Sequence, residues 1–330
     1  MKKNFRYFAG LLGLSMLLTL SVSCREIKKG DYSMNEKLNV KDSSSEKTIQ
    51  EAIAQETKKI DRFDSIPLEY QRKVENGGTI EHISYPTKDY YGDQAEITKF
   101  ANVYLPAEYK KNPSKKYKVL YLMHGIGGDE KEWGMTNDSS LIKMIMDNLA
   151  AKNEIEGFIV VAANGRSGKD FANRNADYNS FYEFGKELRN DLIPYIDAHY
   201  STITDRKGRG MAGLSMGGMQ TINIGICQSL DLISSFGAFS AAPTSYGAPT
   251  VAAHINENPQ YPIDYFYNIC GTEDSIAYNS HLNAARTLPR LTQGLVDGQN
   301  YCWQECHGGH DFKIWNLGFY NFAKIFGGKN

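Results

Sequence analysis

The sequence predicts an α/β fold with a mostly parallel central sheet that is covered by helices on both faces. Three observations lead to this prediction: short apolar runs end at Gly-containing loops, stretches of helical apolar spacing separate these runs, and the two patterns alternate from about residue 63 onward. Composition is that of an ordinary globular protein, with 41% hydrophobic and 23% charged residues among 330. The formal net charge of -1 lacks the basic excess of nucleic-acid-binding proteins, so we expect no nucleic-acid partner.

The elements follow from these patterns in chain order. Apolar or alternating runs that stop at a turn predict strands over 79–85, 97–105, 117–123, 158–162, 210–214, 265–270 and 300–306. Apolar residues at helical spacing predict helices over 141–151, 181–199, 217–227, 277–291 and 314–326. Parallel strands bring their carboxyl ends to one edge of the sheet, and sites in such sheets lie at that edge.

The N-terminus has the anatomy of a signal peptide. Three basic residues lie within the first six, an apolar stretch covers 8–20, and small residues then lead to Cys24. The apolar stretch is short for a membrane span of about 20 residues. Because the pattern resembles a bacterial lipoprotein signal, we expect residues 1–24 to direct export and Cys24 to be lipidated. The protein should then lie in the cell envelope or outside the cell, with a lipid anchor as its only membrane contact.

The rest of the chain divides into a tether and one domain. Residues 25–62 are polar for the most part and rich in Ser, Asn and Lys, which predicts a linker, with a short helix expected over 48–60. Residues 63–330 carry the alternating pattern and form the expected catalytic domain. The sequence does not indicate an oligomeric state.

The pattern Gly213-Leu214-Ser215-Met216-Gly217 is the strongest chemical motif in the chain. It lies between a predicted strand and a predicted helix, which is the context that a nucleophile elbow requires. The turn is so tight that the residues beside the serine must be small, and the two glycines meet that requirement. The turn pushes the serine hydroxyl outward, so the sequence predicts Ser215 as a nucleophile.

A serine hydroxyl is hardly ionised at neutral pH and needs a general base. The chain order of the α/β-hydrolase fold is nucleophile, acid, histidine, and only His307 and His310 follow the last predicted strand. The other histidines lie on an early strand, at a strand end, in helical stretches or in a polar loop: His82, His124, His199, His281 and His254. We expect His310 to be the base, because it lies beyond a Gly pair from which its ring can swing back over Ser215. The acid should follow the penultimate strand, where Glu273 and Asp274 are hardly separated by spacing alone.

The loop after strand 117–123 reads HGIGG over 124–128. A Gly-rich loop in this place supplies the second backbone donor of the oxyanion hole in esterases, because glycine lets the backbone approach the developing alkoxide. One such donor contributes about 2.7–4 kcal/mol at the transition state. We therefore expect an oxyanion hole built from an N–H of this loop and the N–H of Met216.

Nothing in the sequence indicates a cofactor or a metal. Four cysteines beyond Cys24 show no disulfide-scaffold spacing: Cys227, Cys270, Cys302 and Cys306. Cys302 and Cys306 would lie about 13 Å apart on one strand, beyond the ~7 Å limit for a disulfide, whereas a Cys227–Cys270 pair is left open. We prefer buried thiols beside a base to a zinc site with His307 and His310. No phosphate-cradling loop is present.

The chain from about residue 63 to its end resembles carbohydrate esterase family 1, and within it the feruloyl esterase domains attached to clostridial cellulosomal xylanases. It is more distantly similar to esterase D, an S-formylglutathione hydrolase. The resemblance is carried by VLYLMHGIGG at 119–128 with Glu132-Trp133, AGLSMGG at 212–218, NIG at 223–225, FSAAP at 239–243, CGTEDS at 270–275 and GGHDF at 308–312 with Trp315. It implies an α/β-hydrolase fold with Asp274 rather than Glu273 as the acid, His310 as the base, and the N–H groups of Ile126 and Met216 as oxyanion donors.

The resemblance also implies a substrate class, which is ferulate or acetate esters of plant cell-wall xylan. We favour a feruloyl ester of arabinoxylan, with His124, Trp315 and Tyr246 as candidate substrate contacts. Alternatives are an acetyl xylan esterase, an acyltransferase or thioesterase of the esterase D type, and an inactive carbohydrate-binding surface lipoprotein. This chain departs from the family pattern over 164–179 and 244–260, so those loops are expected to shape the acyl and sugar pockets.

Overall fold

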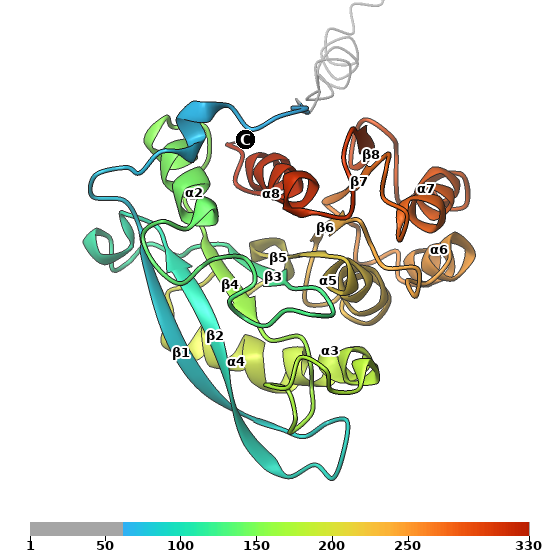
Figure 1. Ribbon diagram of the computed structural model, residues 1–330, viewed down its shortest axis with the longest axis horizontal. Coiled ribbons are helices and arrows are strands. Elements are labelled where there is room, and N and C mark those ends of the chain that lie inside the picture. Colours follow the sequence, from blue (N-terminus) through green and yellow to red (C-terminus); the bar gives the residue numbers. More distant parts are fainter. Residues whose placement is uncertain (1–61, 330) are drawn as a thin grey trace, which may run out of the picture. The chain divides into compact units, whose positions relative to one another are not determined.

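One sheet of eight strands runs through the computed structural model, which describes residues 62–329 (Figure 1). The strands are β1 Thr79–Lys88, β2 Glu96–Leu105, β3 Val119–Met123, β4 Ile159–Ala163, β5 Arg209–Leu214, β6 Ser235–Phe239, β7 Tyr265–Gly271 and β8 Tyr301–Cys306. Their order in the sheet is β1-β2-β4-β3-β5-β6-β7-β8. β2 pairs antiparallel with β1 and with β4, and all other neighbouring pairs are parallel. The strands from β3 to β8 therefore end at one edge of the sheet.

Helices cover both faces of this sheet. The α-helices are α2 Leu141–Ala151, α3 Phe184–Glu187, α4 Ile193–His199, α5 Met216–Gln220, α6 Ala248–Glu257, α7 Tyr278–Thr287 and α8 Phe312–Phe326. Two π-helical turns, η4 Leu188–Leu192 and η6 Thr221–Ile226, continue α3 and α5, and the short 3-10 helices are η1 Leu68–Gln71, η2 Tyr109–Lys111, η3 Tyr178–Glu183, η5 Arg206–Gly208 and η7 Leu288–Arg290. α2 and α8 lie side by side and pack on one face (Figure 1), while α3, α4, η6 and α6 pack on the other.

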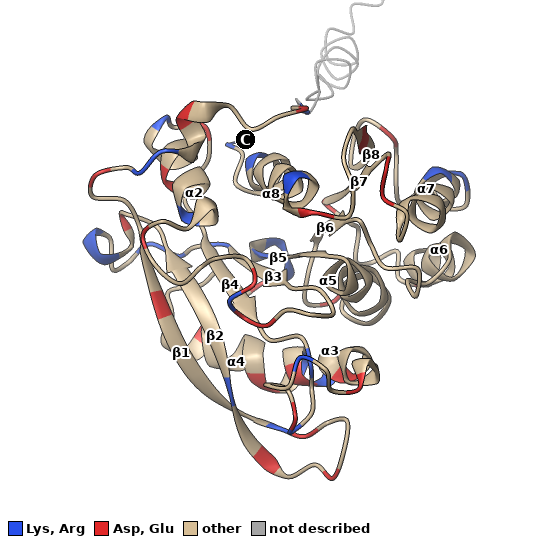
Figure 2. Cartoon of the chain, in the orientation of Figure 1, with Lys and Arg blue, Asp and Glu red and all other residues tan. Residues whose placement is uncertain are grey.

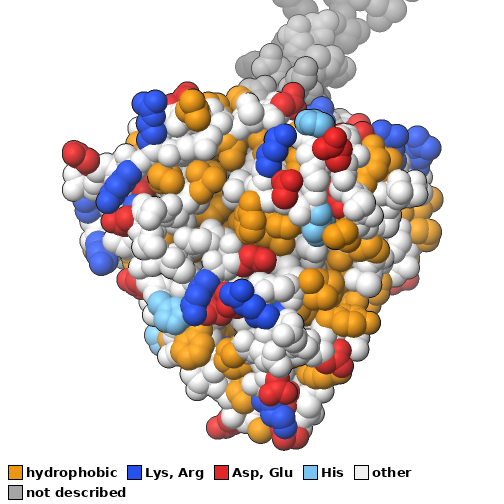
Figure 3. Space-filling view, viewed as in Figure 1, with side chains coloured by type: hydrophobic (Ala, Val, Ile, Leu, Met, Phe, Trp, Pro, Cys, Tyr) orange, Lys and Arg blue, Asp and Glu red, His pale blue; other side chains and the backbone are white. Residues whose placement is uncertain are grey.

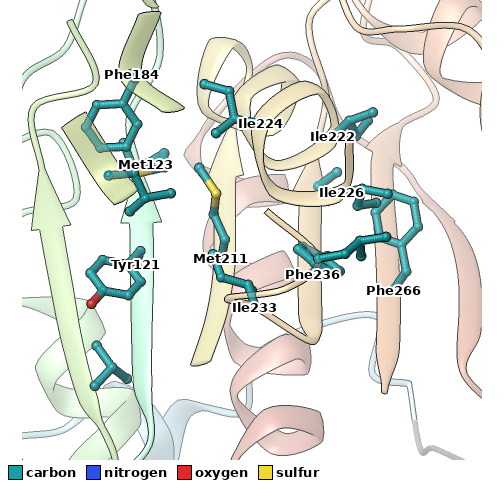
Figure 4. Close-up of a cluster of buried hydrophobic side chains, with 14 of the residues drawn as sticks. Tyr121, Met123, Phe184, Met211, Ile222, Ile224, Ile226, Ile233, Phe236 and Phe266 are labelled. Atoms are coloured by element: carbon teal, nitrogen blue, oxygen red, sulfur yellow. The ribbon is translucent and has the colours of Figure 1, made fainter. Parts of the chain in front are cut away.

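The central strands are apolar throughout because each of their faces is covered. Along β3, Tyr121 and Met123 point into the core under α3, α4 and η6, where Figure 4 shows them with Met211 and Phe236. The residues between them, such as Leu122, point into the core under α2 and α8. Successive side chains of a strand face opposite sides, so a strand that is buried twice reads as a continuous apolar run.

The predicted α/β fold with helices on both faces is confirmed, but two elements were missed. Sequence patterns predict no strand over Ser235–Phe239, where β6 reads SFGAF and all five residues are buried. α6 occupies Ala248–Glu257, part of the segment that the sequence left as an irregular loop. His254 accordingly lies in a helix and not in a polar loop. Both elements form because neighbouring elements bury them, which local propensity does not reveal.

Of the remaining sequence predictions, some are corrected by the structure and others lie outside the residues that it describes. The helix expected over 181–199 is broken into η3, α3, η4 and α4. Cysteines at positions 227, 270, 302 and 306 are all buried free thiols, so Cys227 and Cys270 are not paired. The signal peptide, Cys24 and the helix over 48–60 lie outside the described residues. Between residues 62 and 329, no helix has the length and apolar character needed to cross a bilayer.

Charged residues of both signs are interspersed along the fold (Figure 2). Several ion pairs are exposed, such as Lys73–Asp138, and a pair of this kind contributes about 0–1 kcal/mol to stability. The pair Lys99–Glu187 differs, because both side chains are 0% exposed and Nζ lies 2.7 Å from Oε1. Loss of one partner would leave a buried charge alone, so this pair joins β2 to α3 firmly.

Candidate active site

The turn between β5 and α5 consists of Ser215 alone. Its backbone has φ of 51° and ψ of -113°, a conformation that L-residues rarely adopt. A Cβ on Gly213 would lie 2.6 Å from the carbonyl carbon of Gly217, and a Cβ on Gly217 would lie 2.5 Å from the oxygen of Met123. Both positions therefore require glycine, and the strained turn presents the serine side chain at the carboxyl edge of the sheet.

Three side chains from the ends of β5, β7 and β8 form one chain of hydrogen bonds. The hydroxyl of Ser215 lies 2.9 Å from Nε2 of His310, and Nδ1 of His310 lies 2.7 Å from Oδ2 of Asp274. A carboxylate only accepts, so Nδ1 carries the proton and donates it to Asp274, which leaves Nε2 to accept the serine O–H. The arrangement is that of a serine held ready for deprotonation.

Asp274 is held as a carboxylate. Its Oδ1 accepts hydrogen bonds from the N–H groups of Ile276 at 3.0 Å and Ala277 at 2.8 Å. Burial would raise the pKa of Asp274, but the hydrogen bonds from His310 and Ala277 outweigh burial and lower the pKa to about 2. The side chain is therefore negative at neutral pH and can stabilise an imidazolium on His310.

The neighbouring pair Glu273 and His307 lies outside this chain of hydrogen bonds. Their side chains are 61% and 78% exposed and lie 3.6 Å apart. By contrast, the side chain of Asp274 is 0% exposed and that of His310 is 16% exposed. Spacing does not separate Glu273 from Asp274, but burial does, because only Asp274 reaches the histidine that contacts Ser215.

Residues 125–128 form a turn beside the serine, which we call the oxyanion loop. A Cβ on Gly125 would lie 3.4 Å from the Cβ of Ser215. The N–H of Gly125 donates to Oε2 of Glu132 at 2.6 Å, and its carbonyl accepts from Nδ1 of His124 at 2.7 Å and from the N–H of Gly128 at 3.1 Å. Both polar groups of Gly125 are thus engaged, which fixes the peptide plane that leads into the next residue.

Two backbone amides remain available near the serine hydroxyl. Within residues 62–329, the N–H of Ile126 has no hydrogen-bond acceptor. The N–H of Met216 opens α5, where the first amides of a helix have no intrahelical acceptor. Met216 follows Ser215 directly, and Ile126 follows Gly125, which lies beside Ser215, so the pair can receive a developing oxyanion.

Only one of the three candidate substrate contacts is accessible. His124 is 1% exposed, and its Nε2 accepts from the N–H of Gly165 at 2.8 Å, so both ring nitrogens are occupied. Trp315 packs against the ring of His310 with centroids 5.0 Å apart and is 8% exposed. His124 therefore holds loop backbone and Trp315 packs on the catalytic base. This corrects the expectation that these two side chains contact substrate. Tyr246 is 39% exposed.

A cavity of about 340 Å³ opens between the loop after β6, the first turn of α6, and α7. Its lining is largely apolar and includes Ile222, Ala242, Pro243, Tyr246 and Ala284. The N–H of Ala242, a lining residue, donates to the carbonyl of Ser215 at 3.0 Å, whereas Ser215 and His310 are not themselves in the lining. In Figure 3, hydrophobic side chains gather on the part of the surface where Figure 1 shows α5, α6 and α7.

Sequence reasoning missed the buried side chains that hold the wall of this cavity. Asn223 donates to the carbonyl of Thr244 at 3.3 Å and accepts from the N–H of Tyr246 at 2.7 Å. His281 accepts from the N–H of Ala241 at 3.1 Å and is 3% exposed. Asn223 had a signal, since it belongs to the NIG stretch of the family resemblance. No sequence pattern indicated the role of His281, because the amide that it binds belongs to Ala241, 40 residues earlier in the chain.

A family model described as "Putative esterase" matches residues 98–321. The chain belongs to this esterase family. An endo-1,4-β-xylanase/feruloyl esterase of Xylanibacter ruminicola is 40% identical to this chain over 245 residues, which are 71% of this chain and 31% of that protein. An endo-1,4-β-xylanase Y of Acetivibrio thermocellus is 32% identical over 212 residues, or 59% of this chain and 18% of that protein. The chain thus spans less than a third of the length of either relative.

Solved structures that resemble this chain are also esterases. A CE1 ferulic acid esterase from the anaerobic fungus Anaeromyces mucronatus matches with a TM-score of 0.66 and 28% identity, covering 82% of this chain and 99% of that one. The feruloyl esterase module of Clostridium thermocellum, solved with sinapinate, has a TM-score of 0.66 at 24% identity and covers 81% and 94%. These matches confirm the α/β-hydrolase fold that the sequence predicts and its resemblance to carbohydrate esterase family 1.

Two buried histidines make the stability of the fold depend on pH. Burial lowers the pKa of His124 to about 4 and that of His281 to about 3, against about 6.5 for an unfolded histidine. Below about pH 6.5 the unfolded chain binds protons at these positions and the folded protein does not. The free energy of unfolding should therefore fall as pH falls toward 4, by about 1.4 kcal/mol per pH unit for each histidine.

Urea unfolding between pH 7 and pH 5 measures this slope. His281→Gln keeps an acceptor and a donor but cannot gain a proton, so its slope should be smaller than that of the wild type by the share of one histidine. Parallel slopes for the two proteins would contradict the assignment of a neutral, buried His281.

Proposed function

We propose that this chain is a serine esterase that hydrolyses carboxylic esters through a covalent acyl-enzyme. The observation that carries the proposal is the continuous hydrogen-bond chain from Asp274 through His310 to Ser215, beside the free amides of Ile126 and Met216. Membership of the esterase family supports the same reaction class.

The reaction follows from the positions of these groups. The Oγ of Ser215 attacks the ester carbonyl while Nε2 of His310 takes the serine proton, and the new alkoxide accepts hydrogen bonds from the two amides. Asp274 stabilises the imidazolium. The C–O bond to the alcohol then breaks, and His310 returns the proton to the leaving oxygen. Water attacks the acyl-enzyme by the same steps in reverse order, which releases the acid and restores Ser215.

A feruloyl ester of arabinoxylan is the substrate we propose. The curated relative from Xylanibacter ruminicola and the fungal structure both carry feruloyl or ferulic acid esterase in their names. The apolar cavity beside the nucleophile turn, with Tyr246 in its lining, suits an aromatic acyl group. Export and lipid anchoring at Cys24 remain predictions from the sequence, and they suit an insoluble substrate outside the cell.

Substitutions of the triad should separate it from its exposed neighbours. Ser215→Ala should abolish hydrolysis of p-nitrophenyl acetate, and Asp274→Asn should lower kcat by about 10³–10⁴-fold because the imidazole loses its orienting acceptor. Glu273→Gln is the matched control and should keep kcat within about twofold, since that carboxylate is 61% exposed and pairs with His307 and not with His310. Unchanged turnover in Ser215→Ala, or equal losses in the two carboxylate variants, would remove the proposal.

The substrate is tested by release of acids from arabinoxylan. Ferulate should appear faster than acetate in the same digest, and more acetate than ferulate would favour an acetyl xylan esterase. Tyr246→Ala should raise KM for methyl ferulate by about threefold to tenfold, the size of one aromatic contact, with less effect on p-nitrophenyl acetate. Leu68→Ala serves as the control, because this side chain is 72% exposed and lies in η1, which forms no part of the cavity lining. An added alcohol that outcompetes water would indicate an acyltransferase instead.

A further inference from the structure

Arg166 is buried directly behind the oxyanion loop. It is 0% exposed, and by volume it is the largest fully buried side chain among the described residues. Its Nη1 donates to the carbonyl of Gly128 at 2.7 Å, while Nη2 donates to the carbonyl of Ile126 and to that of Arg174 at 3.2 Å. The guanidinium also lies over the ring of Phe181, 4.9 Å from its centroid. One planar cation therefore connects two carbonyls of the oxyanion loop.

The backbone that carries Arg166 is itself held by buried charges. Nζ of Lys99 donates to the carbonyl of Arg166 at 2.6 Å and to that of Asn164 at 2.9 Å, and it pairs with Glu187. The hydroxyl of Ser167 donates to the same Glu187 at 2.6 Å. These contacts fix the backbone of Arg166 to β2 and α3. The guanidinium therefore links the oxyanion loop to these two elements.

Among residues 62–329, no carboxylate forms an ion pair with Arg166. Asp129 and Glu132 attract the guanidinium electrostatically, but Asp129 forms its ion pair with Arg174 at 2.8 Å, and Glu132 accepts from the N–H of Gly125. Carbonyl oxygens are instead the acceptors of its Nη groups. A planar fork suits this task, because it fixes two acceptors at once, which a lysine cannot do.

The hydrogen bonds of the oxyanion loop show what this fork accomplishes. The peptide before Ile126 is fixed through Gly125, whose carbonyl and N–H are bonded to His124 and Glu132. The peptide after Ile126 is fixed through its carbonyl, which Arg166 binds. The orientations of both peptide planes that meet at Ile126 are therefore fixed. The free N–H of Ile126 is held in a single orientation as a result.

We propose that Arg166 is a positioning residue of the oxyanion hole, which holds the N–H of Ile126 toward the developing alkoxide. The inference rests on the proposed esterase function. Arg166 does not contact substrate; it acts through the backbone that does.

The test compares Arg166→Gln and Arg166→Lys with Arg174→Gln. Arg174 lies on the same loop, and its side chain is 58% exposed, so its variant removes a nearby charge without touching the oxyanion loop carbonyls. Arg166→Gln should lower kcat for p-nitrophenyl acetate by about 10²-fold with KM changed less than about twofold, since a displaced donor is lost only at the transition state. Arg166→Lys should lose less, because it keeps the charge but not the fork. Arg174→Gln should retain the kcat of the wild type.

Phenylboronic acid supplies the readout that a merely structural role would not change. It binds a serine as a tetrahedral adduct, so its inhibition constant should rise across the variants by the same factor by which kcat/KM falls. Melting temperatures report folding, and Arg166→Lys is the variant to use if Arg166→Gln does not fold. Full kcat in a folded Arg166→Gln, or a fall in kcat without weaker boronate binding, would overturn the inference alone. An inactive wild-type protein that does not bind boronate would overturn the proposed function and this inference with it.

Discussion

The close approach of α5 to the end of β3 governs the whole site. Gly213 and Gly217 let the helix begin immediately after the strand, so close to β3 that a Cβ on Gly217 would lie 2.5 Å from the Met123 oxygen. This contact leaves a single residue to make the turn, so the serine side chain and the first amide of α5 both emerge at the carboxyl edge of the sheet. The loops after β3, β7 and β8 end at the same edge, and they can therefore reach the serine without long excursions.

The loops around the serine are held by buried polar side chains as well as by apolar packing. His281 and Asn223 bind the backbone of the loop after β6, and Arg166 and His124 bind the oxyanion loop. Each of these groups has lost its contact with water and has regained hydrogen bonds from backbone atoms. An unmade bond of this kind is costly in the protein interior, so the loops have few alternative conformations. That rigidity suits oxyanion stabilisation, which depends on donors placed before the reaction begins.

The sequence predicted the motifs that lie at strand ends, because each carries a local requirement. Ser215 is flanked by obligatory glycines, and His310 follows a glycine pair after the last strand. Asp274 could not be separated from Glu273 by spacing, since only the fold buries one and exposes the other. β6 and α6 were missed because burial by neighbours, and not local propensity, stabilises them. Arg166 was missed for a similar reason: an arginine in a polar loop has no pattern that reveals its burial against a loop 40 residues earlier.

The central claim is that Ser215 and two backbone amides converge on one reacting carbon. The most direct test is a crystal structure of the protein after reaction with a p-nitrophenyl phosphonate ester. The account predicts phosphorus bonded to Oγ of Ser215, with the phosphonyl oxygen about 2.7–3.1 Å from the amide nitrogens of both Ile126 and Met216. An adduct on another residue, or a phosphonyl oxygen turned away from both amides, would contradict it.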